Sequence, residues 1–151
     1  MKLNVQDQAG VNDLIYRILK LTPETKHLWG NMEVVEMLQH CNATNKLIMQ
    51  GIESDRKDSF KQKAIKIVYL NLPLKFPKNI KAPKKLKLIT DKETPQNFQK
   101  EQELYIELIS QFPAHTLPNK MYHPAFGNLT PKEWGILNWM HMDHHLRQFG
   151  V

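Results

Sequence analysis

Residues 130–150 read TPKEWGILNWMHMDHHLRQFG, and this stretch holds the clearest helix start in the chain and its most informative side chains. Thr130 and Glu133 form a capping box, in which the Thr hydroxyl accepts a hydrogen bond from the Glu amide and the Glu carboxylate reaches back. Pro131 suits the first helical turn, and Gly150 suits a C-terminal cap. The stretch therefore predicts a helix that begins at the proline and ends just before the glycine.

Two histidines of this helix, His141 and His145, are four residues apart. Such residues lie about 40° apart around a helix and one turn apart along it, so both imidazoles can aim at one point. They share a face with Trp134 and Leu137, which predicts that this face is buried, whereas Asp143 is expected to point outward. Two buried, unpaired imidazoles are costly, so a metal ion or a set of hydrogen bonds must compensate.

A third ligand is usual in a metal site that also holds water. His40 is the candidate, because it borders the apolar stripe of a helix that we predict from a cap at Asn31 to about Ser54. Spacing alone leaves a metal site and a hydrogen-bonded set of core histidines equally open. The side chains that we expect around such a site, as pocket lining or in support of a ligand, are Gln39, Asn45, His123, His144 and Gln148.

The remaining segments predict the rest of the fold. Helical spacing of apolar residues predicts two more long helices, over residues 7–20 and 94–113, and a cap followed by proline predicts a short helix from residue 22. Residues 60–72 fit either a helix or a short extended piece, and the prolines of 72–83 and 114–129 predict irregular structure. Four principal helices, with a long irregular connection between the second and third, predict an all-α four-helix bundle in a single domain of residues 1–151.

Composition excludes several classes of protein. The hydrophobic fraction of 41% and the charged fraction of 24% are ordinary for a globular chain. There is no run of about 18 apolar residues, so no transmembrane helix is expected. The N-terminus lacks the apolar core of a signal peptide, and Cys41 is the only cysteine, so no intrachain disulfide can form. Together these features predict a cytoplasmic protein.

The net charge of +6 is unevenly distributed. Residues 56–92 contain twelve Lys and Arg against two acidic residues, a net charge of +10, which leaves −4 for the rest of the chain. Such a segment can contact nucleic acid or an anionic membrane surface. A solvated, lysine-rich connection is the simpler interpretation, because the lysines match no nucleic-acid module. We therefore expect neither a nucleic acid nor a membrane as partner.

Two blocks of sequence resemble the DinB-like superfamily. The string MLQH at residues 37–40 and the string HMDHHLRQ at residues 141–148 resemble its pattern of one histidine on the second helix and an HxxHH motif, followed by Gln, on the last. The strings WGNM at 29–32 and HPAFGNLT at 123–130 are similar to one bacterial branch of uncharacterised function. The resemblance implies a four-helix bundle with His40, His141 and His145 as ligands of a nickel, zinc or iron ion.

The resemblance also implies a class of function. Some relatives are transferases that act with low-molecular-weight thiols, others are isomerases, and dimers are frequent. We therefore expect a metal-dependent enzyme, such as a thiol transferase or hydrolase, with a small-molecule substrate and a homodimeric assembly. Two alternatives stay open: a non-catalytic, metal-stabilised, stress-related binding protein, and a nucleic-acid-associated protein that uses the basic residues of 56–92. An enzyme requires an open coordination position, whereas protein ligands close a structural metal site.

Overall fold

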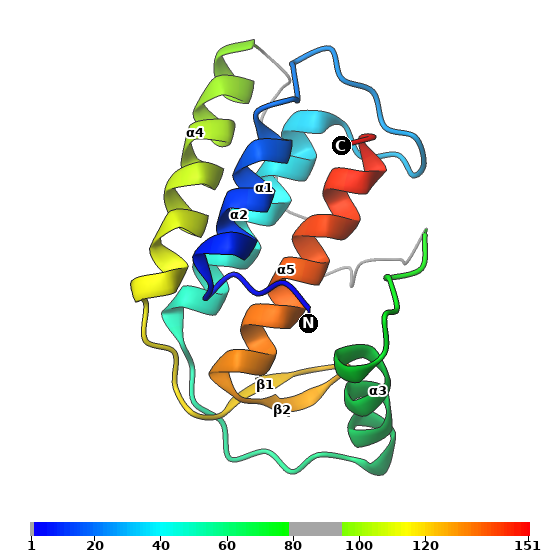
Figure 1. Cartoon of the computed structure of the whole chain (residues 1–151), viewed down its shortest axis with the longest axis vertical. Helices are drawn as coiled ribbons and strands as arrows, with labels where there is room; N and C mark the ends of the chain where they lie inside the picture. The colour runs from blue at the N-terminus through cyan, green and yellow to red at the C-terminus, as the bar shows by residue number, and fades with distance from the viewer. Residues whose placement is uncertain (1, 79–94) are drawn as a thin grey trace.

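A computed structural model of the chain describes residues 2–78 and 95–151 and shows a mostly helical protein (Figure 1). Its α-helices are α1 (Gln8–Ile18), α2 (Val34–Gln50), α3 (Phe60–Asn71), α4 (Pro95–Gln111) and α5 (Pro131–Gln148), and the 3-10 helix η2 (Phe112–Ala114) follows α4. The strands β1 (Met121–His123) and β2 (Gly127–Leu129) form an antiparallel pair before α5. In the described residues, no helix is long and apolar enough to cross a bilayer.

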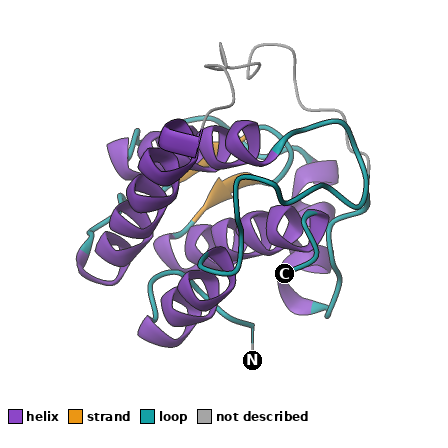
Figure 2. Cartoon of the chain, turned by 90° about the horizontal axis from the view of Figure 1, so that it is seen from above, coloured by secondary structure: helices purple, strands orange, loops and turns teal. Residues whose placement is uncertain are grey.

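Four of the helices pack alongside one another and enclose the core. Helix α2 lies against α4 and α5, and α1 lies against α4 and α5, an arrangement that is seen from above in Figure 2. Helix α3 stands apart from α1, α2 and α4 and contacts α5 and β2. The side chains that fill the core include Val11, Leu14, Ile18, Met37, Leu38, Cys41, Tyr105, Ile109, Phe112, Met142 and Leu146. The predicted helical class is therefore confirmed.

The expectation of an irregular loop over 114–129 is wrong at its end, where the β1–β2 hairpin forms. Met121 pairs with Leu129 and His123 with Gly127. The indole Nε1 of Trp134 on α5 donates to the carbonyl oxygen of Met121 at 3.2 Å, which fixes the hairpin to the start of that helix. Strands of three residues around a proline are too short to show a period in the sequence, so tertiary contacts decide their structure.

The connection between α2 and α4 is less irregular than predicted, because it contains α3. The Ser59 hydroxyl accepts from the Gln62 amide at 3.2 Å, and the Gln62 side chain accepts from the Ser59 amide at 2.8 Å. This capping box settles the open choice between helix and extended chain in favour of a helix. Residues 72–78 are irregular, as predicted. The rest of the predicted connection, including the cap at Thr94, lies outside the described residues.

The short helix predicted from residue 22 is wrong. The Thr25 amide donates to the Thr22 carbonyl oxygen at 3.0 Å, and the Thr22 amide donates to Thr25 Oγ1 at 2.9 Å. These two bonds close a single turn, after which the chain continues without helical structure through Gly30. The Thr25 hydroxyl therefore stabilises a turn, and Thr22 does not cap a helix. Threonine side chains are known to compete with helix formation in this way.

Helix α2 is shorter at both ends than predicted. It begins at Val34 rather than at Asn31, because the Glu36 carboxylate accepts from the Glu33 amide at 2.9 Å and so caps the helix there. It ends at Gln50, since Gly51 adopts a left-handed conformation with φ of 61°. A left-handed glycine is a common helix terminator.

The N-terminal segment crosses α1 and α5 at two glycines. The Val5 amide donates to the carbonyl oxygen of Gly135 at 3.2 Å, and Asn4 Nδ2 donates to the carbonyl oxygen of Lys132 at 3.2 Å. A Cβ atom added to Gly10 would lie 2.1 Å from the Asn4 carbonyl oxygen, and one added to Gly135 would lie 1.9 Å from Asn4 Oδ1. The absence of side chains at both positions is what allows this crossing.

We expect Gly10→Ala to lower the free energy of unfolding by about 1–3 kcal/mol, as overpacking does in a close-packed interior. The clash is with backbone, which cannot rotate away, so it outweighs the gain of about 0.5–1 kcal/mol from better helix propensity. Urea unfolding would measure the change. Gln8→Ala, at an exposed position in the first turn of the same helix, should stay within about 0.5 kcal/mol of the parent. Equal stability of both variants would contradict the close crossing.

Candidate metal centre

Helices α2 and α5 bring the three predicted ligand histidines to one point. The Nε2 atom of His141 lies 3.0 Å from Nε2 of His40 and 3.1 Å from Nε2 of His145. One ring nitrogen from each side chain lies within 4.8 Å of the other two. His145 is buried, and His40 and His141 are half-buried. The pair on α5 follows from helical spacing, whereas His40 joins it from 101 positions away in sequence.

Burial keeps these imidazoles neutral. Desolvation lowers the pKa of His40, and it lowers the pKa of His145 to about 3. The pKa of His141 falls well below its usual range, first because of desolvation and then because of the neighbouring imidazoles. Two positive charges so close together would repel each other in a medium of low dielectric constant. At neutral pH the three rings are therefore uncharged and available as ligands.

A hydrogen bond to Gln148 determines which nitrogen of His145 carries the proton. Gln148 Nε2 donates to the Trp29 carbonyl oxygen at 2.9 Å, so its Oε1 atom is the acceptor that faces His145 Nδ1 at 3.1 Å. The Nδ1 atom of His145 must then carry the proton, which leaves a lone pair on Nε2. That lone pair points at the centre of the three histidines. Gln148 thus holds His145 in the tautomer that a metal requires.

The three nitrogens fit a shared cation. The His145 Nε2 lone pair faces His141 Nε2, which also lies about 3 Å from His40 Nε2. A proton on His141 Nε2 can form a good hydrogen bond to only one of these two nitrogens, and the lone pair of the other is left without a proton to accept. Nitrogen ligands of one ion lie roughly 3.0–3.4 Å apart when metal–nitrogen bonds are about 2.0–2.1 Å long. Two of the three separations, 3.0 and 3.1 Å, therefore match those of imidazoles that share a divalent ion.

Gly30, in the segment before α2, leaves space for the Gln148 side chain. Gly30 has φ of 80°, and a Cβ atom there would lie 2.7 Å from Gln148 Nε2. The neighbouring Leu28 amide donates to the Gln148 carbonyl oxygen at 2.7 Å. Trp29 and Gly30 therefore act on the site through the Gln148 side chain, and Leu28 before them bonds the Gln148 backbone. Sequence reasoning marked this pair without finding its role.

His144 does not join the three histidines but forms an aromatic wall beside them. Its ring centroid lies 5.2 Å from that of His145, 6.1 Å from that of Trp29 and 6.2 Å from that of Phe76. Desolvation lowers the pKa of His144, so it too is neutral at neutral pH. The ammonium group of Lys78 lies 4.6 Å from the centroid of Trp29, which places one cation at the edge of this wall.

Gln39 and Asn45 differ in their relation to the site. Gln39 is half-buried next to His40, and its Oε1 atom has no hydrogen-bond partner among the residues that the structure describes. Asn45 is wholly buried, and its Oδ1 atom accepts from Asn138 Nδ2 at 2.9 Å. Asn138 lies about one turn before His141, so this bond ties α2 to α5 next to the site. Asn45 is therefore tied into the fold, whereas the Oε1 atom of Gln39 is buried without a partner among the described residues.

The expectation that Asp143 points outward is wrong. Its carboxylate lies 3.0 Å from Arg17 of α1 and 2.8 Å from Arg147, and its side chain is only 13% exposed. Arg17 also donates to the carbonyl oxygen of Val151 at 3.0 Å. Helix α5 is thus held between α2, which it meets through histidines, and α1, which it meets through this ion pair.

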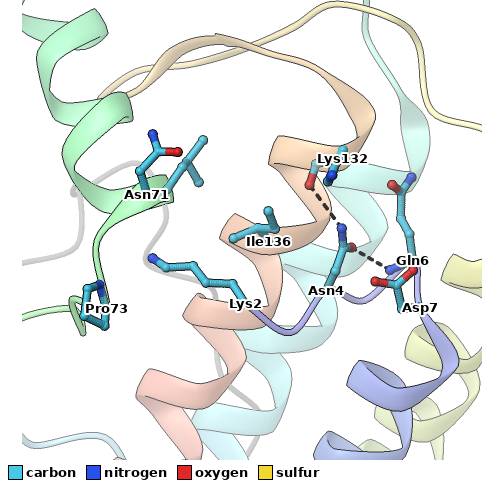
Figure 3. A pocket seen from close by; sticks show the side chains of 9 residues that line it. Lys2, Asn4, Gln6, Asp7, Asn71, Pro73, Lys132 and Ile136 are labelled. Carbon is cyan, nitrogen blue, oxygen red and sulfur yellow. Dashed lines mark hydrogen bonds between the residues drawn. The ribbon is translucent and has the colours of Figure 1, made fainter.

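A hollow of about 890 Å³ lies elsewhere, between the N-terminal segment, the end of α3 and the start of α5 (Figure 3). Its lining residues are Lys2, Asn4, Gln6, Asp7, Leu70, Asn71, Pro73, Lys132 and Ile136, and none of the three histidines is among them. Lys2 donates to the Tyr69 carbonyl oxygen at the end of α3, and Asn4 is bonded to backbone on both sides. Lys2 and Asn4 therefore stabilise the fold through these hydrogen bonds.

A comparison with protein families finds one match, to a family described as "Protein of unknown function (DUF1569)", over residues 2–150. The match includes all three histidines and the hairpin. Searches of curated proteins and of solved structures find no match.

His123 on β1 is packed against the hairpin and α5. Its Nδ1 atom accepts from the Ala125 amide at 3.1 Å, and its ring lies 5.0 Å from that of Phe126 and 5.5 Å from that of Trp134. Desolvation lowers its pKa from 6.5 to about 4. In the unfolded chain the imidazole takes up a proton at pH 6.5, but in the folded chain it does so only near pH 4. Its contribution to stability is therefore present above pH 6.5 and is lost as pH falls toward 4.

We expect His123→Asn to flatten the dependence of stability on pH. Asparagine keeps an acceptor for the Ala125 amide but does not titrate. Between pH 7 and pH 4 the parent should lose on the order of 3 kcal/mol more of its unfolding free energy than the variant loses. Urea unfolding across this range measures the difference, with the values at pH 8 as the reference for lost packing. Parallel curves for the two proteins would contradict the buried, neutral state of His123.

Proposed function

This chain belongs to the DUF1569 family, whose function is unknown, and we propose that it is a metal-dependent enzyme with a DinB-like four-helix bundle. The proposal assigns His40, His141 and His145 as the ligands of one divalent ion. The observation that carries it is the convergence of three neutral imidazole nitrogens from two helices. Imidazole suits nickel, zinc and iron, so we propose an ion of this group.

The residues of the proposed site have two roles: some bind the ion, and others orient the ligands or line the surroundings of the ion. An ion bound there would act as a Lewis acid that lowers the pKa of a bound water or thiol. His40 and the α5 pair hold the ion from two helices, and Gln148 keeps the proton on Nδ1 of His145. The rings of Trp29 and His144 lie on one side of His145, where in this proposal they would limit the access of water. Three protein ligands leave room for further ligands, as catalytic sites require.

We propose a thiol transferase or hydrolase that acts on a small molecule. The half-buried Gln39 would accept a hydrogen bond from the substrate through its unpartnered Oε1 atom. Lys78 at the edge of the aromatic wall would attract a carboxylate, a group that low-molecular-weight thiols commonly carry. Support for this substrate class comes from a cation over Trp29, whose ring lies beside His144, and from an unpartnered amide oxygen on the residue before His40.

A second candidate is a metal-stabilised protein without catalytic activity, and the burial of His145, only 8% exposed, favours it. Substitution with cobalt(II) distinguishes the two. In an enzyme with an open coordination position, added cysteine changes the visible absorption of the cobalt protein. In a closed structural site, the spectrum stays the same after this addition.

We expect elemental analysis of untagged protein to find about one divalent ion per chain, because three histidines supply the ligands. His40→Ala and His141→Ala should each lose the ion, whereas His115→Ala, which removes a ring bonded to the Met49 carbonyl oxygen, should keep it. Chelation should lower the melting temperature of the parent, since ligand binding to the folded state stabilises it. A parent that stays free of metal after incubation with zinc and nickel would refute the proposal.

Gln148→Leu should weaken metal binding by about 10–100-fold, the usual effect of removing a group that orients a ligand histidine. Gln148→Glu keeps the acceptor for His145 and should lose less affinity. Titration calorimetry with zinc measures both. Gln99→Leu, on the exposed side of α4, is the matched control and should leave the affinity unchanged. Equal affinity in all four proteins would remove Gln148 from the site.

A further inference from the structure

Large apolar side chains are concentrated on the surface at α3 and just beyond it. Among the described residues, ten large apolar side chains are exposed, and five of them lie within residues 60–74. They are Phe60 (88% exposed), Ile67 (62%), Val68 (39%), Leu72 (49%) and Leu74 (41%). Single exposed apolar residues are common on proteins, but a cluster is typical of an interaction surface.

Helix α3 has two apolar sides, and only one of them faces the protein. Ile65, Tyr69 and Leu70 are partly buried and pack against the core. Phe60, Ala64, Ile67 and Val68 lie within about 100° of one another on the other side, at about 100° per residue, and all four are exposed. We call this second side, with the lysines that flank it, the outer α3 face.

Polar contacts fix the helix in this orientation. Lys66 donates to the Asn128 carbonyl oxygen at 2.8 Å, and Gln62 donates to the Tyr122 hydroxyl at 2.7 Å. Lys2 donates to the Tyr69 carbonyl oxygen at the other end of the helix. Figure 1 shows α3 at the edge of the molecule, next to the hairpin. The outer α3 face therefore cannot turn inward without the loss of these contacts.

Exposed lysines border the outer α3 face. Lys61 and Lys63 lie on its two sides, about 20–40° beyond the apolar residues. Lys57 precedes the helix and Lys75 follows it, both exposed. The carboxylate of the nearby Asp58 accepts a hydrogen bond from the Asn128 amide at 2.7 Å. An apolar stripe between lysines is complementary to a partner that is both apolar and anionic.

We infer that the outer α3 face docks on an anionic phospholipid membrane surface, a partner that the lysine composition by itself did not lead us to expect. An amphipathic helix with lysines beside its apolar stripe lies in the plane of such an interface, with its apolar residues between the headgroups. A second copy of the chain would bring lysines against lysines, and the aliphatic side chains of Ile67 and Val68 fit lipid better than the stacked bases of a nucleic acid. This inference does not depend on the metal site.

Vesicle co-sedimentation of the full chain tests the inference. We expect binding to phosphatidylcholine vesicles that contain phosphatidylglycerol and little binding to pure phosphatidylcholine. Added salt should weaken binding, and Lys61→Ala and Lys63→Ala should each reduce it by about fivefold. The double variant Phe60→Glu with Ile67→Glu should abolish it. Leu47→Glu, which replaces a side chain 52% exposed on α2, should bind like the parent.

Four results would overturn the inference. The first is absence of binding to the anionic vesicles, and the second is binding that the double variant leaves intact. The third is sedimentation as a dimer that the double variant dissociates, which would assign the face to a second copy. Tighter binding to a DNA duplex than to the vesicles would assign the lysines to nucleic acid instead. Circular dichroism and melting temperature confirm that each variant is folded before it is scored.

Discussion

The packing of α2 against α5 places three imidazoles where aliphatic side chains usually fill a core. Burial of an imidazole costs free energy unless its polar atoms find partners, and this requirement explains the arrangement of the site. A buried imidazole stays neutral and then presents one N–H and one lone pair, each of which needs a partner. Gln148 satisfies the N–H of His145. The remaining lone pair points at His40 and His141, within about 3 Å of the latter, so the centre of the group is suited to a cation.

Glycines make room for two polar side chains, one of which supports the histidines and the other the hairpin. Gly30 faces Gln148, and Gly127, with φ of 70°, lies where a Cβ atom would be 2.6 Å from the Asp58 carboxylate. Gly30 lies in the string WGNM at residues 29–32, and Gly127 lies in the string HPAFGNLT at residues 123–130. In each case the glycine lies in a loop and the polar group comes from a distant part of the chain. The physical reason for a glycine is thus close approach, combined with a positive φ.

Helix α3 is held by a different balance of forces from the other helices. None of its residues is fully buried, and hydrogen bonds from Lys66, Gln62 and Lys2 attach it to the hairpin and the N-terminal segment. Partial burial of Ile65, Tyr69 and Leu70 therefore acts together with these bonds, while the apolar residues of the outer α3 face stay on the surface. The histidine centre and the outer α3 face lie on different elements, so substitutions can test them separately.

Local sequence determined the elements whose signals lie within a turn or two. The capping box, the span of α5 and the pairing of His141 with His145 are of this kind, because side-chain bonds and helical spacing operate over three or four residues. Tertiary structure alone decided that His40 meets this pair, although it lies 101 positions before His141. It also decided that Gln148 sets the tautomer of His145 and that the proline-containing segment 114–129 ends in a hairpin. It also decided that the acidic side chain of Asp143 faces Arg17 and that one apolar side of α3 stays exposed. These outcomes depend on which remote elements pack together, and no period or cap in a single segment carries that information.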